Sequence, residues 1–335
     1  MANVQALFEQ FHNNIRTYYE INETLREKKD IIVRRVKAHL ARKGRPTCQE
    51  YLQGSYKMKV GICALDGAEF DIDVGLRFSF DEAKYTATEV RNWVFEAVDG
   101  HTEDVDAKGP CIRVTYKDGF HVDLVSYAWW DDALGIERHR LAHRDDGWRP
   151  ADPPKLVQWV KDARAPFVDT KDTATQTDQF RRVVRYLKRW NDLAIRGESP
   201  DKPSGLALVL LAKQHLSAPA LTWAGAADDR LAVERVARAA ADTVGRISAY
   251  KPTPEYEDMF GRLDNAAMTK LKDRFGKLRD AVVDAGNATD PHVACKRLRD
   301  VFGDDFPCPD AKKQESETAM RTAAPAVVPS SSSAA

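Results

Sequence analysis

Apolar residues recur three or four positions apart through the first forty residues of the chain, a spacing typical of a helix with one buried face. Gly44 and Pro46 then interrupt the pattern. The sequence therefore predicts a long N-terminal helix over residues 4–43, with a break near Asn22. The residues that carry the pattern in its first half are Leu7, Phe8, Phe11, Ile15 and Tyr18.

A different pattern, in which apolar and polar residues alternate, appears within residues 49–128. Alternation of this kind is typical of strands with one buried face. The predicted strands cover residues 70–78, 111–116 and 120–125. Lys117, Asp118 and Gly119 separate the last two strands, and the Asp-Gly pair among them favours a tight hairpin turn. A helical pattern over residues 87–98 follows the first strand.

The pattern over residues 153–302 is almost wholly helical. The predicted helices cover residues 178–194, 204–216, 231–250, 265–285 and 292–302. A small mixed or antiparallel sheet followed by a run of helices predicts an α+β fold with two lobes. We expect the N-terminal helix and the sheet in residues 1–150, a helical lobe in residues 151–308, and a disordered tail rich in Ala, Ser and Pro in residues 309–335.

The overall charge does not favour non-specific binding to nucleic acid. Lys+Arg and Asp+Glu each number 51, so the formal net charge is zero, whereas such proteins usually carry a basic excess. Residues 26–45 nevertheless hold nine basic side chains against Glu27 and Asp30. This stretch fits either a solvated helix face or a docking surface for nucleic acid or a regulatory protein.

The five cysteines are scattered, odd in number and without a Cys-x-x-Cys pair, which predicts neither a disulfide framework nor a zinc finger. His292 and Cys295 lack two further well-spaced ligands, which argues against zinc at that point. Free cysteines fit a reducing cytosol. The N-terminus has no signal-peptide pattern, and the longest apolar run, Leu206 to Ala212, is too short to span a bilayer. We therefore expect a cytoplasmic protein with no membrane partner.

Three acidic residues, Asp71, Asp73 and Asp123, stand inside otherwise apolar strand patterns. Asp71 and Asp73 are two positions apart, so both carboxylates leave the same face of a strand. Asp is disfavoured in strands, and adjacent like charges raise each other's energy. Two Mg²⁺ ions about 4 Å apart would compensate this charge and suit in-line phosphoryl transfer, with Asp123 as a third ligand. A solvated edge strand is the alternative interpretation, and the apolar setting of all three acids argues against it.

Gly54 and Ser55 precede these acids in the chain. A glycine lets the backbone approach an anion, and the serine hydroxyl can donate to a phosphate oxygen. A Gly-Ser pair alone carries little information, so its weight comes from the acids that follow. Gln53 is either a pocket residue or an ordinary loop glutamine.

Several motifs together resemble a known family. Residues 52–56 (Leu-Gln-Gly-Ser-Tyr), 71–73 (Asp-Ile-Asp) and 121–123 (His-Val-Asp) resemble the signature of polymerase-beta-type nucleotidyltransferases. The chain resembles more closely the bacterial cGAS/DncV-like nucleotidyltransferases (CD-NTases), which are related to oligoadenylate synthases. The resemblance extends from about Phe8 to Pro307. One departure is Lys59-Val60-Gly61, where many relatives carry a Gly-Thr pair. The later segments that resemble the family are residues 185–191, 203–207, 252–258 and 301–307.

The resemblance implies a two-lobed enzyme that condenses ATP, GTP, UTP or CTP into a cyclic di- or trinucleotide second messenger and releases pyrophosphate. It implies two Mg²⁺ ions, with Mn²⁺ as an alternative, held by Asp71 and Asp73. Asp123 would help to bind the catalytic metal and would activate the ribose hydroxyl. A separate effector would read the product in anti-phage defence, and a regulatory protein, a nucleic-acid activator or a tail-conjugating partner could act on the enzyme. The alternatives are a linear oligonucleotide synthase and an inactive nucleotide-binding regulatory module.

The resemblance also assigns two residues of the helical lobe to nucleotide binding. Lys188 borders an apolar helix stripe, one turn after Val184, so it either turns toward the triphosphate or stays solvated among neighbouring arginines. Ser204 precedes an apolar helix and is expected to cap it. It would also contact phosphate if that helix start faces the nucleotide.

Overall fold

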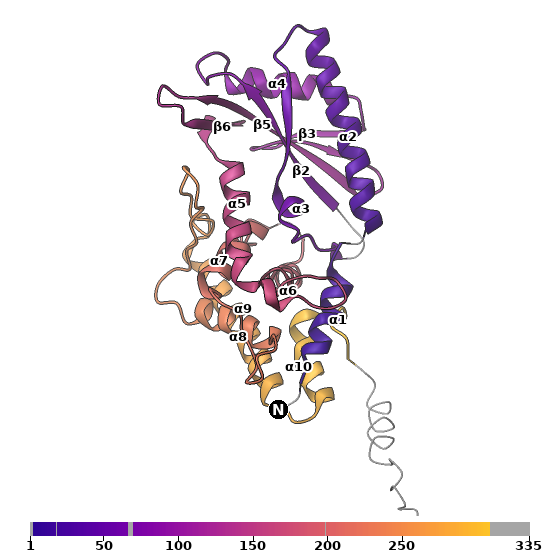
Figure 1. The fold of residues 1–335 in the computed structure, drawn as a ribbon, viewed down its shortest axis with the longest axis vertical. Coiled ribbons are helices and arrows are strands. Elements are labelled where there is room, and N and C mark those ends of the chain that lie inside the picture. Colours follow the sequence, from indigo (N-terminus) through magenta and orange to yellow (C-terminus); the bar gives the residue numbers. More distant parts are fainter. Residues whose placement is uncertain (1–2, 18, 66–69, 198, 309–335) are drawn as a thin grey trace, which may run out of the picture.

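The computed structural model describes residues 3–17, 19–65, 70–197 and 199–308 (Figure 1). Within these residues the chain forms one lobe built on a seven-stranded mixed sheet and a second lobe of helices. The predicted two-lobed α+β fold is therefore confirmed. The tail for which disorder is predicted, residues 309–335, lies outside the described residues.

The N-terminal helical pattern forms two helices, α1 (Gln5–Ile15) and α2 (Tyr19–Arg42). Arg16 is extended, with φ −73° and ψ 150°, so the first helix ends before the break predicted near Asn22. The two helices serve different cores. Phe8 and Phe11 of α1 are fully buried in the helical lobe, whereas Ile32 of α2 is buried against the sheet.

The sheet has the strand order β1-β2-β5-β4-β3, and β6 and β7 extend it from the far end of β5. All pairs are antiparallel except β2 with β5. The three predicted strands are present, and β4 and β5 form the expected hairpin around Gly119. The strands are β1 (Cys48–Leu52), β2 (Phe70–Ser79), β3 (Asp104–Ala107), β4 (Ile112–Thr115), β5 (Phe120–Asp131), β6 (Glu137–His143) and β7 (Gly147–Pro150).

Helices α2 and α4 (Ala87–Val98) cover one face of this sheet (Figure 1). Helix α4 has the predicted bounds, and a capping box of Thr86 and Glu89 fixes its start. Ile72 and Val74 of β2 are fully buried in the core beneath the two helices. Since side chains alternate along a strand, the residues of β2 on either side of Ile72 and Val74 point their side chains to the opposite face of the sheet.

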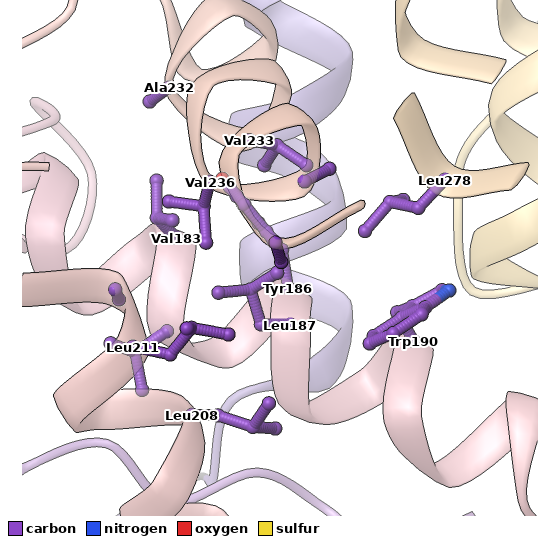
Figure 2. Packing of buried hydrophobic residues seen from close by; sticks show 14 of the residues in the cluster. Val183, Tyr186, Leu187, Trp190, Leu208, Leu211, Ala232, Val233, Val236 and Leu278 are labelled. Atoms are coloured by element: carbon purple, nitrogen blue, oxygen red, sulfur yellow. The ribbon is translucent and has the colours of Figure 1, made fainter. Parts of the chain in front are cut away.

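The helical lobe is built around α6, as Figure 2 shows. Val183, Tyr186 and Leu187 of α6 are fully buried and contribute to one core with side chains of α7, α8 and α9. The helix predicted over residues 231–250 ends at Ala241, and Gly245 in the following turn has a φ of +75°. The helices are α5 (Pro153–Arg164), α6 (Gln179–Ala194), α7 (Gly205–His215), α8 (Asp229–Ala241), α9 (Asn265–Asn287) and α10 (Pro291–Phe302).

A buried ion pair joins α6 to α8. The Arg182 guanidinium donates to both carboxylate oxygens of Asp229, at 2.7 and 2.8 Å, and both side chains are fully buried. The Tyr186 hydroxyl donates to the same carboxylate at 2.9 Å. These hydrogen bonds compensate the negative charge of the buried Asp229 carboxylate, which would strongly destabilise the fold without a partner.

The cysteine prediction is wrong for one pair. Cys295 of α10 and Cys308 form a disulfide, whereas Cys48, Cys63 and Cys111 are free thiols. The reason is the path of the chain, which turns back along α10 after Gly303, where φ is +68°. Among the described residues, no helix is both long enough and apolar enough to cross a bilayer.

Candidate active site

The three candidate acids lie on the sheet face opposite α2 and α4. Strands β2 and β5 run parallel, with Asp73 directly opposite Asp123 and Asp71 opposite His121. Asp71, Asp73 and Asp123 line one cleft of about 580 Å³ between the sheet and the helical lobe. Asp71 is exposed, Asp73 is half-buried and Asp123 is buried. The structure therefore brings the three predicted carboxylates together.

The cleft holds more negative charge than its own cations compensate. Burial raises the pKa of Asp73 from 3.8 to about 7, and the charges of Asp71 and Asp123 add to this rise. Arg113 and Lys188 offset only part of the effect. Carboxylate oxygens gathered on two neighbouring strands are the donor set that a hard divalent cation prefers, and a bound cation would favour the ionised form of Asp73.

Sequence reasoning missed Arg113, which holds the third acid in place. Its Nε and Nη2 donate to the two carboxylate oxygens of Asp123 at 2.8 and 2.7 Å. This pairing raises the pKa of Arg113, so the guanidinium stays charged. The signal was available in the sequence, because a hairpin centred on Asp118 pairs residue 113 with residue 123.

Gly54 brings the backbone next to an acidic side chain. Its φ is +63°, and a Cβ atom at this position would lie 1.8 Å from Oδ2 of Asp73. No residue with a side chain fits there without displacing the carboxylate. Gly54 and Ser55 begin the short helix α3 (Gly54–Met58), and both line the cleft with the acids.

Gln53 is fixed in the same cleft by a neighbouring strand. The Tyr127 hydroxyl of β5 donates to Oε1 of Gln53 at 3.1 Å. The same Oε1 would lie 3.1 Å from a Cβ atom on Gly75, so the glycine makes room for the amide. These contacts place Gln53 in the wall of the cleft rather than in a free loop.

The helical lobe contributes Lys188 of α6 and Ser204, which precedes α7. The Lys188 ammonium donates to the Val60 carbonyl at 3.2 Å, and burial lowers the pKa of Lys188 although Asp71 and Asp73 favour its charged form. Ser204 caps α7 as predicted, since its Oγ accepts from the Ala207 N–H at 3.2 Å. Both residues line the cleft that contains the acids.

Gly205 explains how the lysine reaches this position. A Cβ atom on Gly205 would lie 3.1 Å from Cε of Lys188, so the first residue of α7 leaves room for the lysine side chain. The start of α7 and the Lys188 ammonium therefore meet on one wall of the cleft, opposite the sheet. Unpaired N–H groups at a helix start and a buried ammonium both favour a bound anion.

A second cavity of about 740 Å³ adjoins the first, because Ser55, Asp71 and Lys188 line both. Its lining is strongly basic, with two acidic side chains, Asp71 and Asp192, against eight cationic ones. Such a surface attracts polyanions. The cationic side chains are Arg16, Arg26, Lys59, Arg164, Lys171, Arg181, Arg185 and Lys188.

Comparison with known sequences identifies this arrangement. Residues 49–127 match the family described as "Cyclic GMP-AMP synthase DncV-like, nucleotidyltransferase domain". The chain is also 25% identical over 175 residues to a cyclic GMP-AMP synthase from Escherichia albertii. That match covers 50% of this chain and only 37% of the relative.

Solved structures of similar fold cover nearly the whole chain. Vibrio cholerae DncV cyclic AMP-GMP synthase, in complex with the linear intermediate 5′ pppA(3′,5′)pG, has a TM-score of 0.72 at 15% identity over 90% of this chain and 96% of its own. CdnC from E. coli MS115-1, in a complex with HORMA-deltaN, has a TM-score of 0.65 at 14% identity over 90% of this chain and 98% of its own. Residues 49–127 therefore match a DncV-like nucleotidyltransferase domain, and the chain as a whole shares the two-lobed fold of DncV and CdnC.

Proposed function

We propose that this protein is a magnesium-dependent nucleotidyltransferase that condenses nucleoside triphosphates into a cyclic di- or trinucleotide and releases pyrophosphate. The observation that carries the proposal is the convergence of Asp71, Asp73 and Asp123 on one cleft wall, opposite Lys188 and the start of α7. Carboxylates on one side and anion-binding groups on the other suit a triphosphate bridged by divalent cations.

The residues present fit two Mg²⁺ ions, with Mn²⁺ as an alternative, because three carboxylates on two paired strands line one cleft and offer the oxygen ligands that such ions prefer. Asp71 and Asp73 would hold both ions, and Asp123 would help to hold one. When bound, such ions neutralise the triphosphate and the leaving pyrophosphate.

The chain's own residues would perform the remaining work. Lys188, Ser204 and the backbone at Gly54 and Ser55 would bind and orient the triphosphate. Asp123, which accepts two hydrogen bonds from the Arg113 guanidinium of β4, would orient the ribose hydroxyl of the second nucleotide and accept its proton. The hydroxyl oxygen then bonds to the α-phosphorus as the bond to pyrophosphate breaks, and a second transfer within the linear intermediate closes the ring.

Two adjoining cavities support a product made from more than one nucleotide. Their combined space exceeds that of a pocket for a single small ligand, and they meet at Ser55, Asp71 and Lys188. The basic second cavity is suited to the triphosphate of the other substrate, or to the linear intermediate when it turns for ring closure. The DncV complex contains a linear intermediate of this kind. ATP and GTP are the substrates we expect first, with UTP and CTP as alternatives.

The experiment that tests this proposal is incubation of the full chain with the four NTPs and Mg²⁺, then phosphatase treatment and mass spectrometry. A cyclic product resists phosphatase because it has no terminal phosphate, and its mass gives the bases and the ring size. Products wholly sensitive to phosphatase would replace the proposal with a linear oligonucleotide synthase. An absence of any nucleotidyl product under all activating conditions would favour an inactive nucleotide-binding module.

We further propose that the cyclic product activates a separate effector in anti-phage defence, as the family resemblance implies. A regulatory protein is a candidate activator, because CdnC forms a complex with HORMA-deltaN. Addition of a purified candidate regulator to the NTP assay tests this point. An increase in product that disappears in Asp73→Asn would support regulation of the same site, whereas an unchanged rate would exclude that regulator.

A further inference from the structure

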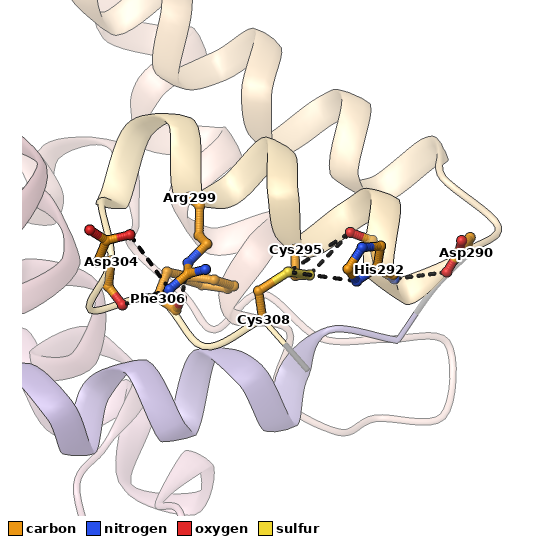
Figure 3. Close-up of a disulfide and its surroundings, with 7 residues drawn as sticks. All are labelled: Asp290, His292, Cys295, Arg299, Asp304, Phe306 and Cys308. Atoms are coloured by element: carbon orange, nitrogen blue, oxygen red, sulfur yellow. Dashed lines mark hydrogen bonds and ion pairs between the residues drawn. A yellow bond between two sulfur atoms is a disulfide. The ribbon is translucent and has the colours of Figure 1, made fainter. Parts of the chain in front are cut away.

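A second cluster of side chains that could hold a metal ion lies on and beside α10 (Figure 3). Helix α10 is at the end of the helical lobe remote from the sheet (Figure 1). His292 and Cys295 are on the first turns of α10, and Cys308 follows the chain reversal after that helix. The imidazole nitrogen and the two sulfur atoms all lie within 4.8 Å of one another. The sequence places only two of these ligands together, and the fold supplies the third.

The histidine lies beside the sulfur pair at nearly the distance that separates two ligands of a zinc ion, and the two sulfur atoms, bonded to each other in this structure, become separate ligands only after reduction. Nδ1 of His292 is 4.0 Å from Sγ of Cys308, and ligands around a tetrahedral zinc ion are about 3.5–3.8 Å apart. His292 and Cys295 are three positions apart on α10, so they share one helix face. Cys295 is fully buried, whereas His292 and Cys308 are half-buried, so the cluster is partly open to solvent.

The charge chemistry also favours a cation. The disulfide is the oxidised form of the sulfur pair, and two electrons and two protons from a reductant convert it to two thiols. Three other cysteines of the chain are free thiols, so the fold does not depend on a general network of disulfides. Two adjacent thiols near a helix start lose protons readily when a divalent cation is present to hold both sulfurs.

We propose that the reduced protein binds one zinc ion through Nδ1 of His292 and the sulfur atoms of Cys295 and Cys308, with water as the fourth ligand. Binding releases the two thiol protons to solvent and leaves the imidazole neutral. This site is separate from the acid cleft and requires a soft-ligand metal, whereas the cleft offers carboxylate oxygens.

The ion would secure a segment that supports the helix of Lys188. Residues 303–308 are attached to α10 by the cysteine pair, and Phe306 within them packs against Phe8 and Phe11 of α1, with ring centroids 5.2 Å apart in both cases. Asp305 of the same segment pairs with Arg189 of α6 at 3.1 Å. Loss of the ion should therefore lower the thermal stability of the whole helical lobe.

The test uses the full chain without an affinity tag, because a histidine tag itself binds zinc. After purification with a phosphine reductant, we expect about one zinc per chain by elemental mass spectrometry. Replacement of zinc by Co²⁺ should produce thiolate-to-cobalt charge-transfer absorption, and chelation should lower the thermal midpoint by about 5 °C or more. Cys308→Ser and His292→Gln should both lose the ion, whereas Cys48→Ser, which removes a free thiol of β1, should keep it.

His292→Gln retains both sulfurs and a half-exposed position, so it remains informative if Cys308→Ser fails to fold. A reduced wild type with no stoichiometric zinc and no cobalt–thiolate absorption would overturn the proposal, and the sulfur pair would then be a disulfide alone. Zinc retained at wild-type level in both His292→Gln and Cys308→Ser would also overturn it, because the ion would then lie elsewhere.

Discussion

Replacement of Asp73 with asparagine tests whether the carboxylates of the cleft repel one another when no cation is bound. Burial and the charges of Asp71 and Asp123 raise the pKa of Asp73 from 3.8 to about 7. Asparagine has nearly the same shape but never ionises, so it removes the repulsion and preserves the packing. We expect the metal-free Asp73→Asn protein to be more stable than the wild type at alkaline pH.

The size of this effect follows from proton linkage. A folded pKa above the unfolded one means that the folded protein keeps a proton that the unfolded chain has released. The free energy of unfolding of the wild type therefore decreases as the pH rises from 3.8 through about 7. Three pKa units correspond to about 4 kcal/mol, of which about 2.5 kcal/mol is lost between pH 5 and pH 8. Solvent screens a half-buried group, so these figures are upper limits.

The assay is urea unfolding in the presence of EDTA at pH 5 and pH 8, followed by circular dichroism. Asp131→Asn is the matched control, because Asp131 is exposed at the other end of β5. We expect the advantage of Asp73→Asn over the wild type to grow with pH and that of Asp131→Asn to stay near zero. An Asp73→Asn protein that is less stable than the wild type at pH 8 would contradict this expectation, because the carboxylate would then be a structural contact.

Three further changes test other parts of the structure. Gly54→Ala places a Cβ atom 1.8 Å from a carboxylate oxygen and should lower the rate of product formation by about 100-fold. The control is Gly100→Ala, which lies in open space at a similar φ and should leave the rate unchanged. Equal rates of product formation in the two variants would contradict the prediction. Arg182→Met leaves the Asp229 carboxylate buried without its cation and should reduce the free energy of unfolding by about 3–5 kcal/mol in urea titrations. Burial and a neighbouring guanidinium lower the pKa of His12 from 6.5 to about 2, so the unfolded chain binds an extra proton below pH 6.5 and stability should fall by about 2 kcal/mol at pH 5. His12→Gln should remove this component of acid sensitivity.

The sequence predicted the parts of the fold that follow local periodicity. Helix α4 has its predicted bounds because a capping box coincides with the start of its apolar pattern. The acid face of β2 was predictable because Asp71 and Asp73 alternate with buried residues. The parallel pairing that places Asp123 beside Asp73 depends on long-range topology, so it required the structure.

Other features had no local signal. Strands β1, β6 and β7 are short or rich in charged residues, and their pairing with the edges of the sheet, rather than their own composition, makes them strands. The Cys295–Cys308 pair depends on a chain reversal that spacing along the sequence does not reveal. The domain boundaries and the roles of the cleft residues stay predictions.

In the proposed mechanism Asp71, Asp73 and Asp123 act together on a metal-bound triphosphate, and the rate of pyrophosphate release is the most direct measure of this cooperation. The rate should be measured with mixed NTPs over a range of Mg²⁺ concentrations for the wild type, for the asparagine variant of each acid, and for Asp131→Asn. We expect magnesium-dependent release by the wild type and by Asp131→Asn, and loss of release in all three acid variants although each stays folded. Wild-type rates in any of the three acid variants would contradict it.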